Sequence, residues 1–328
     1  MHRRQFLFAT LVMSTGASGA RANAAASGAL VWRQRAMLGL GTTLTLRAAH
    51  ADATQLERAL DAAAQAIRRV EAAMNLHRAD SELVRLNQQG YLDHPSEELL
   101  KALTTALHIS ERSGGMFDLS VQPLWALYDQ ARRDGRLPDA EEIDAVRPRV
   151  GWRGVHLGPQ RIELRRAGMA LTCNGIAQGQ ATDAARQALQ RHGVTHALIN
   201  AGEFATLGHN DRGQAWTLGL ENPRDEARLL TALRNDGRSV ATSADNRSSF
   251  SADHRHHHIF DPATGDSPPE LSGVTVLAPG AMMADALTKV MFVAGPSRIP
   301  HLAKRWNVGV LWVDKAGRWQ ATADIALA

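Results

Sequence analysis

The sequence predicts a mixed α/β or α+β fold in which helices pack on mixed sheets. Apolar residues recur every three or four positions over two long stretches of the first half of the chain, which is the spacing of amphipathic helices. In the second half, short apolar runs typical of strands alternate irregularly with further helical stretches. This irregular order disfavours a purely parallel, doubly wound sheet. The 328 residues, 44% of them hydrophobic, are enough to bury a sizeable core.

Two helices are predicted in the first half. The first runs from Thr54 to Met74, and one of its faces gathers Leu56, Leu60, Ala63, Ile67, Val70 and Met74. The second runs from Ser96 to about Arg112, with Pro95 pre-set for its first turn and Gly114-Gly115 at its end. We expect the polar residues 76–87 between them to form a loop.

The second half is predicted to begin with a helix over residues 174–192, opened by a glycine-rich turn and ended by Gly193. The later elements are strands at 196–201, 216–220, 239–242 and 274–278, helices at 283–293 and 297–306, and an apolar strand at 308–313. The stretch 147–158, rich in proline, arginine and glycine, is the best place for a seam between two subdomains.

The N-terminal residues 1–24 have the pattern of a twin-arginine export signal. Arg3-Arg4 precede a short apolar run, and Ala22-Asn23-Ala24 offers a cleavage site. The alternative is a short amphipathic helix of the mature fold, but the apolar run is too short to span a membrane. The pattern therefore predicts a periplasmic mature chain, residues 25–328, without stable membrane insertion. The single cysteine, Cys173, allows no internal disulfide.

The charge balance gives no argument for a nucleic-acid partner. The formal net charge is +4, and residues 1–24 contain Arg3, Arg4 and Arg21 but no acidic residue, so their removal lowers it by three. An almost neutral mature chain lacks the basic excess that favours binding to a phosphate backbone.

A histidine-rich run occupies residues 254–258, with His254, His256, His257 and His258. Neutral imidazoles bind zinc and copper, so a transition-metal site is one interpretation. Consecutive residues of a strand point to opposite faces, however, so at most two of the four can converge. A solvated histidine run is the second interpretation. The third is a histidine that leads into the tight turn Asp261-Pro262-Ala263-Thr264-Gly265.

This last pattern, together with six others in chain order, resembles the ApbE family of FAD:protein FMN transferases. His258 before Asp261-Pro262-x-Thr264-Gly265 resembles the family's His and Asp-Pro-x-Thr-Gly. The other six are Leu40-Gly41-Thr42, Ser81-Glu82-Leu83 with Arg85-Leu86-Asn87, Gly115-Met116-Phe117-Asp118 with Pro123-Leu124, Gly175-Ile176-Ala177-Gln178-Gly179 with Asp183, Ala241-Thr242-Ser243, and Ala284-Asp285-Ala286-Leu287.

The resemblance implies a two-subdomain, T-fold-related architecture and an enzyme that transfers FMN from FAD, with Mg²⁺, to a threonine of an acceptor protein in a respiratory or redox complex, releasing AMP. It implies catalytic roles for His258 and Asp285. The flavin-binding residues it implies are Leu40, His77, Met116, Phe117, Asp118, Thr172, Gln178, Ser243 and His258. The metal-binding residues it implies are Gly175 through its carbonyl, Asp285, Thr288 and Lys289.

The residue types suit this chemistry. Backbone N–H groups of a glycine-rich turn at a helix start can hold the diphosphate of FAD, although the glycines of 175–179 can also serve tight packing alone. Asp285 offers the hard oxygen that Mg²⁺ prefers. His258, with an ordinary pKa of about 6.5, can accept the threonine proton at neutral pH, or it merely hydrogen-bonds the turn.

The sequence departs from the family pattern at three positions of the implied site. Thr172 stands where many members have aspartate, Gln178 where they often have lysine, and Lys289 where they usually have threonine. Lys289 can pair with Asp285 and occupy the cation's place, or it points away and Thr288 or a backbone group completes the shell. Glu203, in Asn200-Ala201-Gly202-Glu203, supplies the acid of the family's Gly-Gly-Asp turn one step later.

Two other functions remain open at this point. One is a flavin-binding paralogue that has lost transferase activity through the changes at Thr172, Gln178 and Lys289, and that acts in the maturation of a respiratory metalloenzyme. The other is a periplasmic metal-binding protein built around residues 254–258.

Overall fold

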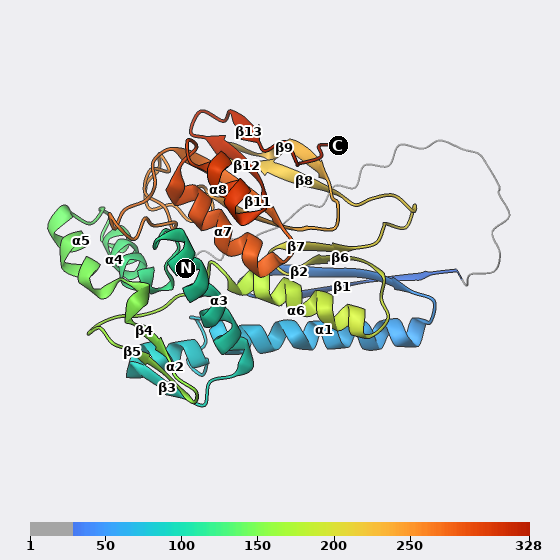
Figure 1. Cartoon of the computed structure of the whole chain (residues 1–328), viewed down its shortest axis with the longest axis horizontal. Helices are drawn as coiled ribbons and strands as arrows, with labels where there is room; N and C mark the ends of the chain where they lie inside the picture. The colour runs from blue at the N-terminus through green and yellow to red at the C-terminus, as the bar shows by residue number, and fades with distance from the viewer. Residues whose placement is uncertain (1–28) are drawn as a thin grey trace.

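The computed structural model describes residues 29–328, so the predicted export signal at 1–24 lies outside the described residues. Its centre is an eight-stranded sheet with the strand order β1-β2-β6-β7-β10-β11-β12-β13 (Figure 1). The strands are β1 (Val31–Gly39), β2 (Thr42–His50), β6 (His196–Asn200), β7 (Phe204–Leu207), β10 (Ser239–Ala244), β11 (Leu271–Ala278), β12 (Gly309–Asp314) and β13 (Trp319–Ala321). Each strand pairs antiparallel with its neighbour.

Four helices cover one face of this sheet in the same order as the strands. They are α1 (Ala53–Met74), α6 (Ala177–Arg191), α7 (Ala281–Ala294) and α8 (Ile299–Trp306). Helix α1 lies on β1 and β2, α6 on β6 and β7, α7 on β10 and β11, and α8 on β12, while α6 contacts α1 on one side and α7 on the other (Figure 1). The apolar stripe of each helix is thereby buried against the sheet.

The opposite face is covered in part by a hairpin, β8 (Thr217–Asn222) and β9 (Asp225–Arg234). Leucines of the hairpin, Leu218, Leu220 and Leu233, pack against side chains of β10, β11 and β12. Alternate residues of a strand point to opposite faces, so the central strands are buried on both sides here, and β11 is buried along its whole length.

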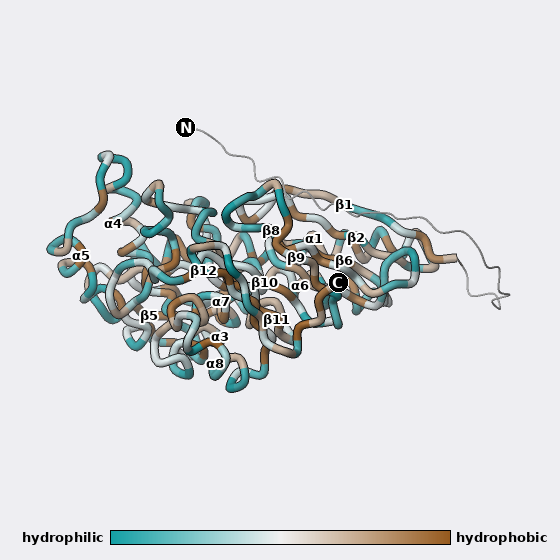
Figure 2. Tube along the Cα trace, turned by 90° about the horizontal axis from the view of Figure 1, so that it is seen from above, coloured by the Kyte–Doolittle hydropathy of each residue, from teal (hydrophilic) through white to brown (hydrophobic). Residues whose placement is uncertain are grey.

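A second group of elements extends from one end of the sheet. It contains a three-stranded sheet, β3 (Tyr91–Asp93), β5 (Arg161–Leu164) and β4 (Val155–Leu157), and the helices α2 (Glu82–Gln89), α3 (Glu97–Ser113), α4 (Gln122–Arg133) and α5 (Ala140–Val146). Short 3₁₀ helices η1 (Leu119–Val121), η2 (Arg147–Arg149) and η3 (Trp152–Gly154) link them. In Figure 2, α4 and α5 lie at one end of the long axis, and the β1–β2 hairpin at the other.

The first-half helices are confirmed, with one correction between them. Helix α1 begins after Asp52, whose carboxylate accepts hydrogen bonds from the backbone N–H groups of Thr54 and Gln55. Helix α3 begins after Ser96, whose hydroxyl caps it, so Pro95 precedes the helix and is not part of its first turn. Residues 76–87 are not all loop, because α2 starts at Glu82. Only Leu83 and Leu86 of α2 are buried, and two residues make a weak periodic signal.

The elements predicted in the second half are confirmed within a few residues. The opening hairpin β1–β2, the helices α4 and α5, and the strands β7 and β9 were not predicted. On β2, Leu44, Leu46 and Ala48 face the core and alternate with threonine and arginine, which is the period of a half-buried strand. The fold class is confirmed, and the antiparallel pairing throughout the three described sheets places the chain on the α+β side. The seam at 147–158, a stretch that holds η2 and η3, stays a prediction.

Candidate active site

The starts of helices α6 and α7 meet at Gly179. A Cβ atom at this position would lie 2.3 Å from the carbonyl oxygen of Ala281 and 2.6 Å from the Cα atom of Met282, so no other residue type fits without a shift. The carboxylate of Asp183, on α6, accepts hydrogen bonds from the backbone N–H groups of Ala281 (2.9 Å) and Met282 (3.0 Å). An α6 side chain therefore caps α7 and fixes the two helix starts against each other.

This junction places Asp285 beside the glycine-rich turn. Asp285 lies on α7 and is 1% exposed, and its Oδ2 atom accepts a hydrogen bond of 3.1 Å from the Gly179 N–H. The structure thus brings the turn and this carboxylate into direct contact. The N–H of Gly179 bonds a carboxylate of the protein itself, so the anion held by this part of the helix start is Asp285.

Lys289 occupies the other side of the same carboxylate. Its Nζ atom bonds Asp285 Oδ1 and also lies 3.2 Å from the Asp285 carbonyl oxygen. Of the two arrangements that the sequence left open, the structure shows the ion pair. The position of the two residues, one helical turn apart on α7, brings their side chains together.

The hydroxyls of Thr288 and Ser243 close the inner side of this group. The Thr288 hydroxyl donates to the Asp285 carbonyl oxygen at 2.6 Å, and its oxygen lies 2.7 Å from the Ser243 hydroxyl oxygen. Because the Thr288 proton is already used, Ser243 is the donor of the second bond. Both side chains predicted to bind metal or flavin thus join α7 to the end of β10.

Glu203, which was not among the predicted site residues, also belongs to the site. It lies in the turn between β6 and β7, is 6% exposed, and accepts a hydrogen bond of 3.1 Å from the Thr242 N–H. Burial raises the pKa of Glu203 well above its ordinary value, and the charge of Asp285 adds to this, while Lys289 acts in the opposite direction. The sequence signal that could have found Glu203 is an acidic residue directly after Gly202, in the turn that follows a predicted strand.

Three of the implied flavin-binding residues surround the glycine-rich turn. A Cβ atom at Gly175 would lie 3.2 Å from Lys289 Cε and 3.3 Å from the ring of Phe117, so this glycine is enclosed by both side chains. The amide of Gln178 lies 3.4 Å from the Leu40 carbonyl oxygen, in the β1–β2 turn. Leu40, Phe117 and Gln178 therefore come to the site from three distant parts of the chain.

Other implied flavin-binding residues have separate roles in the structure. The buried carboxylate of Asp118 accepts bonds from the Ser120 N–H and hydroxyl and from the Trp152 N–H, so it joins η1 to η3. The Thr172 hydroxyl accepts from the Asn174 N–H at 3.2 Å. Met116 packs on the core next to Phe117, and His77 is exposed just after α1. Their contacts with FAD stay predictions.

His258 sits in the loop after β10 with one ring nitrogen already engaged. Its Nδ1 atom is 3.2 Å from the Ser248 carbonyl oxygen, which only accepts, so Nδ1 carries the proton and Nε2 keeps its lone pair. Burial lowers the pKa of His258 to about 4, and the nearby charge of Lys289 contributes to this. The imidazole is consequently neutral at pH 7 and has a free base at Nε2.

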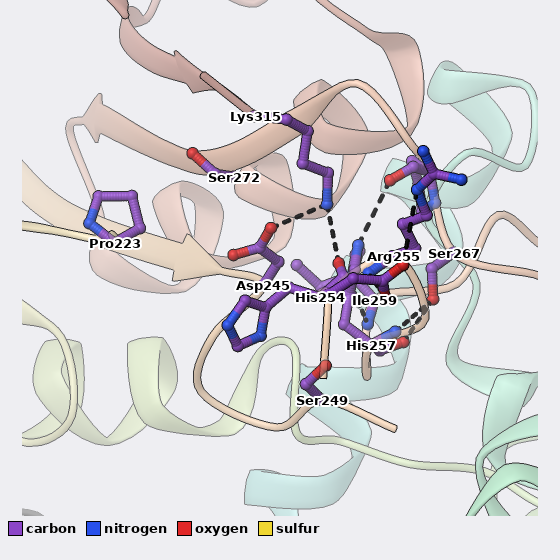
Figure 3. Close-up of polar contacts among 12 residues, drawn as sticks. Pro223, Asp245, Ser249, His254, Arg255, His257, Ile259, Ser267, Ser272 and Lys315 are labelled. Carbon is purple, nitrogen blue, oxygen red and sulfur yellow. Dashed lines mark hydrogen bonds and ion pairs between the residues drawn. The ribbon is translucent and has the colours of Figure 1, made fainter. Parts of the chain in front are cut away.

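The loop that carries His258 is anchored by a buried ion-pair network (Figure 3). Asp245, fully buried just after β10, accepts a bond from Lys315 at 2.8 Å. Its carboxylate also accepts two bonds from Arg224, at 2.7 and 2.6 Å. Lys315 also donates to the His254 carbonyl oxygen at 2.9 Å. The network connects the β8–β9 turn, the residue after β12 and the histidine-rich run.

The histidine-rich run is not a metal site in this structure. His256 Nδ1 bonds Asp266 at 2.8 Å, the buried His257 Nε2 lies 3.3 Å from the Pro268 carbonyl oxygen, and His258 bonds Ser248. Within residues 29–328, no three histidine, cysteine, aspartate or glutamate side chains are grouped so that they can hold a metal ion. Each of these three imidazoles therefore bonds a partner of its own, and the run bends at His254, whose φ of 58° lies in the left-handed region.

The residues implied for Mg²⁺ do not fit that ion in this arrangement. A magnesium ion lies about 2.1 Å from its oxygen ligands and prefers an octahedral shell. The Asp285 carboxylate already has the Gly179 N–H on one oxygen and the Lys289 ammonium on the other, and Thr288 bonds the Asp285 carbonyl oxygen. A divalent cation at Oδ1 would meet the ammonium at close range.

Two open hollows on the surface of residues 29–328 lie away from this group of residues. One of about 600 Å³, between β1 and α1, is lined by Arg35, Arg58 and Arg68 among others. Another of about 510 Å³ is lined by residues that include Arg147, Val150 and Pro262, and it adjoins the turn after His258. Neither is lined by Asp285, Lys289 or Glu203, so we assign the site from its convergent polar groups and not from cavity size.

Comparison with known proteins adds independent evidence. The model of the ApbE family matches residues 40–312. An FAD:protein FMN transferase of Escherichia coli strain K12 is 26% identical over 257 residues, which are 74% of this chain and 73% of that protein. An FAD:protein FMN transferase of Klebsiella pneumoniae strain 342 is 30% identical over 263 residues, 76% of this chain and 80% of that protein.

Comparison with solved structures gives the same family. The crystal structure of the ApbE protein of Thermotoga maritima superposes with a TM-score of 0.79 at 25% sequence identity, covering 89% of this chain and 97% of that one. Sequence and structure therefore give one consistent family likeness over most of the described residues.

Proposed function

The chain belongs to the ApbE family, a family of transferases, and on that basis we propose that it transfers FMN from FAD to a threonine hydroxyl of an acceptor protein. The observation that carries the proposal is the hydrogen bond between Gly179 and Asp285, 106 positions apart, because it joins the glycine-rich turn to the buried charges of α7. Phe117 and Lys289 flank the same turn, and Lys289 lies close enough to influence His258.

His258 is the base of the proposed reaction. The acceptor hydroxyl oxygen attacks the phosphorus of the FMN half of FAD, its proton passes to His258 Nε2, and the bond from that phosphorus to the bridging oxygen breaks. AMP leaves with the bridging oxygen, and the acceptor keeps FMN as a phosphate ester. The neutral imidazole and its fixed Nδ1–H orientation support this role. No step is assigned to Mg²⁺, because its implied ligands do not fit it here.

The purified full chain tests this proposal with FAD and an acceptor that the Escherichia coli relative labels, so that the relative serves as positive control. We expect covalent flavin on an acceptor threonine by mass spectrometry and one AMP per flavin. His258→Ala should lower the rate about 10²- to 10⁴-fold, as expected for loss of a general base. His301→Ala, an exposed histidine on α8, is the matched control.

The ion pair of Asp285 with Lys289 specifically favours a second candidate, a flavin-binding paralogue with weakened catalysis that serves maturation of a respiratory metalloenzyme. Two results together would favour this alternative over the transferase. The chain would still bind FAD, and the acceptor would stay unlabelled by this chain although the relative labels it.

We further propose that the chain is exported to the periplasm by the twin-arginine route and that its acceptor belongs to a respiratory or redox complex there. Arg3-Arg4 and the cleavage site Ala22-Asn23-Ala24 support export. Within residues 29–328, every helix is too short or too polar to cross a bilayer. Cell fractionation tests this proposal. The Arg3→Lys, Arg4→Lys double variant should stay in the cytoplasm, and export of this variant equal to that of the wild type would contradict the proposal.

A further inference from the structure

The site of Asp285 contains two buried carboxylates and one ammonium. Asp285 and Glu203 are 1% and 6% exposed, and the Glu203 pKa is raised in part by the charge of Asp285. Two carboxylates that are both buried from solvent need a compensating positive charge or a proton. Lys289 supplies that charge, and its side chain is 18% exposed, so it remains accessible from solvent.

The ammonium of Lys289 is held as a small cation would be held. It bonds a carboxylate oxygen and a carbonyl oxygen of Asp285, which are hard oxygen donors of the kind that metal cations prefer. Its stem lies along Gly175, where the absent side chain makes room for Cε. An ammonium has three N–H donors, and two of them serve Asp285, so the third is available to a ligand oxygen.

The choice of lysine at this position fits such a role. The chain contains four lysines and 33 arginines, so arginine is its usual cation. A guanidinium is planar and broad, whereas an ammonium is a compact point charge that fits between Asp285 and Gly175. Lysine also binds phosphate as a point charge in other phosphate sites.

From these contacts we infer that Lys289 is the resident cation of the site and takes the place of a divalent metal toward the diphosphate of FAD. The inference rests on the proposed transferase function and specifies how its charge is supplied. During transfer, Lys289 donates an N–H to a diphosphate oxygen while negative charge moves onto the bridging oxygen of the leaving AMP. The bonds formed and broken are those given above, and no further reactant is needed.

The first test is metal dependence of the purified full chain. After treatment with EDTA, the wild-type rate of acceptor labelling should change less than about twofold, and added Mg²⁺ should not raise it. Lys289→Met should lower FAD affinity about tenfold to a hundredfold, the usual effect of losing a hydrogen bond to a charged group. Lys304→Met, an exposed lysine on α8, is the matched control and should match the wild type.

The second test measures cation binding without turnover. Mn²⁺, added alone as a spectroscopic probe in place of Mg²⁺, should not bind the wild type by electron paramagnetic resonance, whereas Lys289→Thr should bind it and regain labelling only with Mg²⁺. Because Lys289→Met leaves Asp285 unpaired, the double variant Asp285→Asn, Lys289→Met keeps the charge balance if the single variant does not fold. The double variant should also show weakened FAD affinity.

Each outcome assigns a cause. Wild-type labelling that EDTA abolishes and Mg²⁺ restores, or tight binding of Mn²⁺ by the wild type, would overturn the inference, because Lys289 would then yield its place to a metal. If no acceptor is labelled under any condition while the Escherichia coli relative labels it, the transferase function fails, and the Mn²⁺ and FAD affinities still decide the role of Lys289.

Discussion

At the scale of single residues, burial sets the chemical state of two adjacent histidines. His257 is 0% exposed, donates from Nε2 toward the Pro268 carbonyl oxygen, and meets the ring of Phe292 edge to face at 5.4 Å. Burial lowers the pKa of His257 to about 3, and the nearby His258, once it is protonated, and the charge of Lys315 contribute to this. Its neutral form packs in the core, and the neutral form of His258 provides a base.

A prediction about acid stability follows from the pKa values of these two imidazoles. In the unfolded chain both imidazoles have a pKa of about 6.5. Below that pH the unfolded state therefore binds more protons than the folded state, in which both pKa values are lower. The free energy of unfolding should therefore fall as pH drops from about 6.5 toward 4, and by up to about 1.4 kcal/mol per pH unit for each histidine.

Urea denaturation between pH 7 and pH 4 checks this. His257→Gln removes one of the two contributions, so its stability should depend less steeply on pH than that of the wild type. His301→Gln, an exposed change, should leave the slope unaltered. Parallel curves for His257→Gln and the wild type would show that His257 does not carry this dependence.

At the scale of elements, the approach of α6 to α7 determines the site. Gly179 lies on α6, where alanine is intrinsically the better helix former by about 1 kcal/mol. The carbonyl oxygen of Ala281, 2.3 Å from the added Cβ, belongs to backbone and cannot turn away as a side chain would. Packing therefore outweighs propensity at this position, and the glycine allows Asp285 to reach the α6 backbone.

Gly179→Ala should accordingly lower the stability of the protein by about 1–3 kcal/mol, the usual cost of overpacking, instead of raising it. Moving α7 away should also weaken FAD binding, because Asp285 and Lys289 move with the helix. Chemical denaturation and FAD titration measure the two effects. Gln187→Ala, at an exposed position of α6, should change stability by less than about 0.5 kcal/mol. A Gly179→Ala protein as stable as the wild type would refute the packing argument.

At the scale of the whole molecule, the order of the antiparallel sheet brings the site together. Strands β7 and β10 are neighbours, so Glu203, before β7, and Ser243, on β10, reach the same side as α7. The network of Asp245, Arg224 and Lys315 then ties the His258 loop to the β8–β9 turn and to the end of β12. Sequence-distant segments become neighbours because the sheet and its helix layer follow one common order.

Local patterns predicted a large part of this fold. The 3.6-residue period gave α1, α3, α7 and α8 within a few residues, and apolar runs gave β6, β8, β10, β11 and β12. Elements with weak signals were not predicted. Helix α2 buries only Leu83 and Leu86, and strand β2 was missed although Leu44, Leu46 and Ala48 alternate with polar residues. The family likeness, which the comparisons confirm, followed from the order of short motifs along the chain.

The sequence by itself thus determined the longer helices and many of the strands, the family and which residue types could carry the chemistry. Only the tertiary structure decided that Lys289 pairs with Asp285, that Glu203 is buried beside them, and that the histidines of 254–258 diverge. Periodicity and turn chemistry act between residues a few positions apart, so they can be read along the chain. The charge state of a site depends on burial and on partners brought from distant segments, and those exist only after the helices and strands have packed.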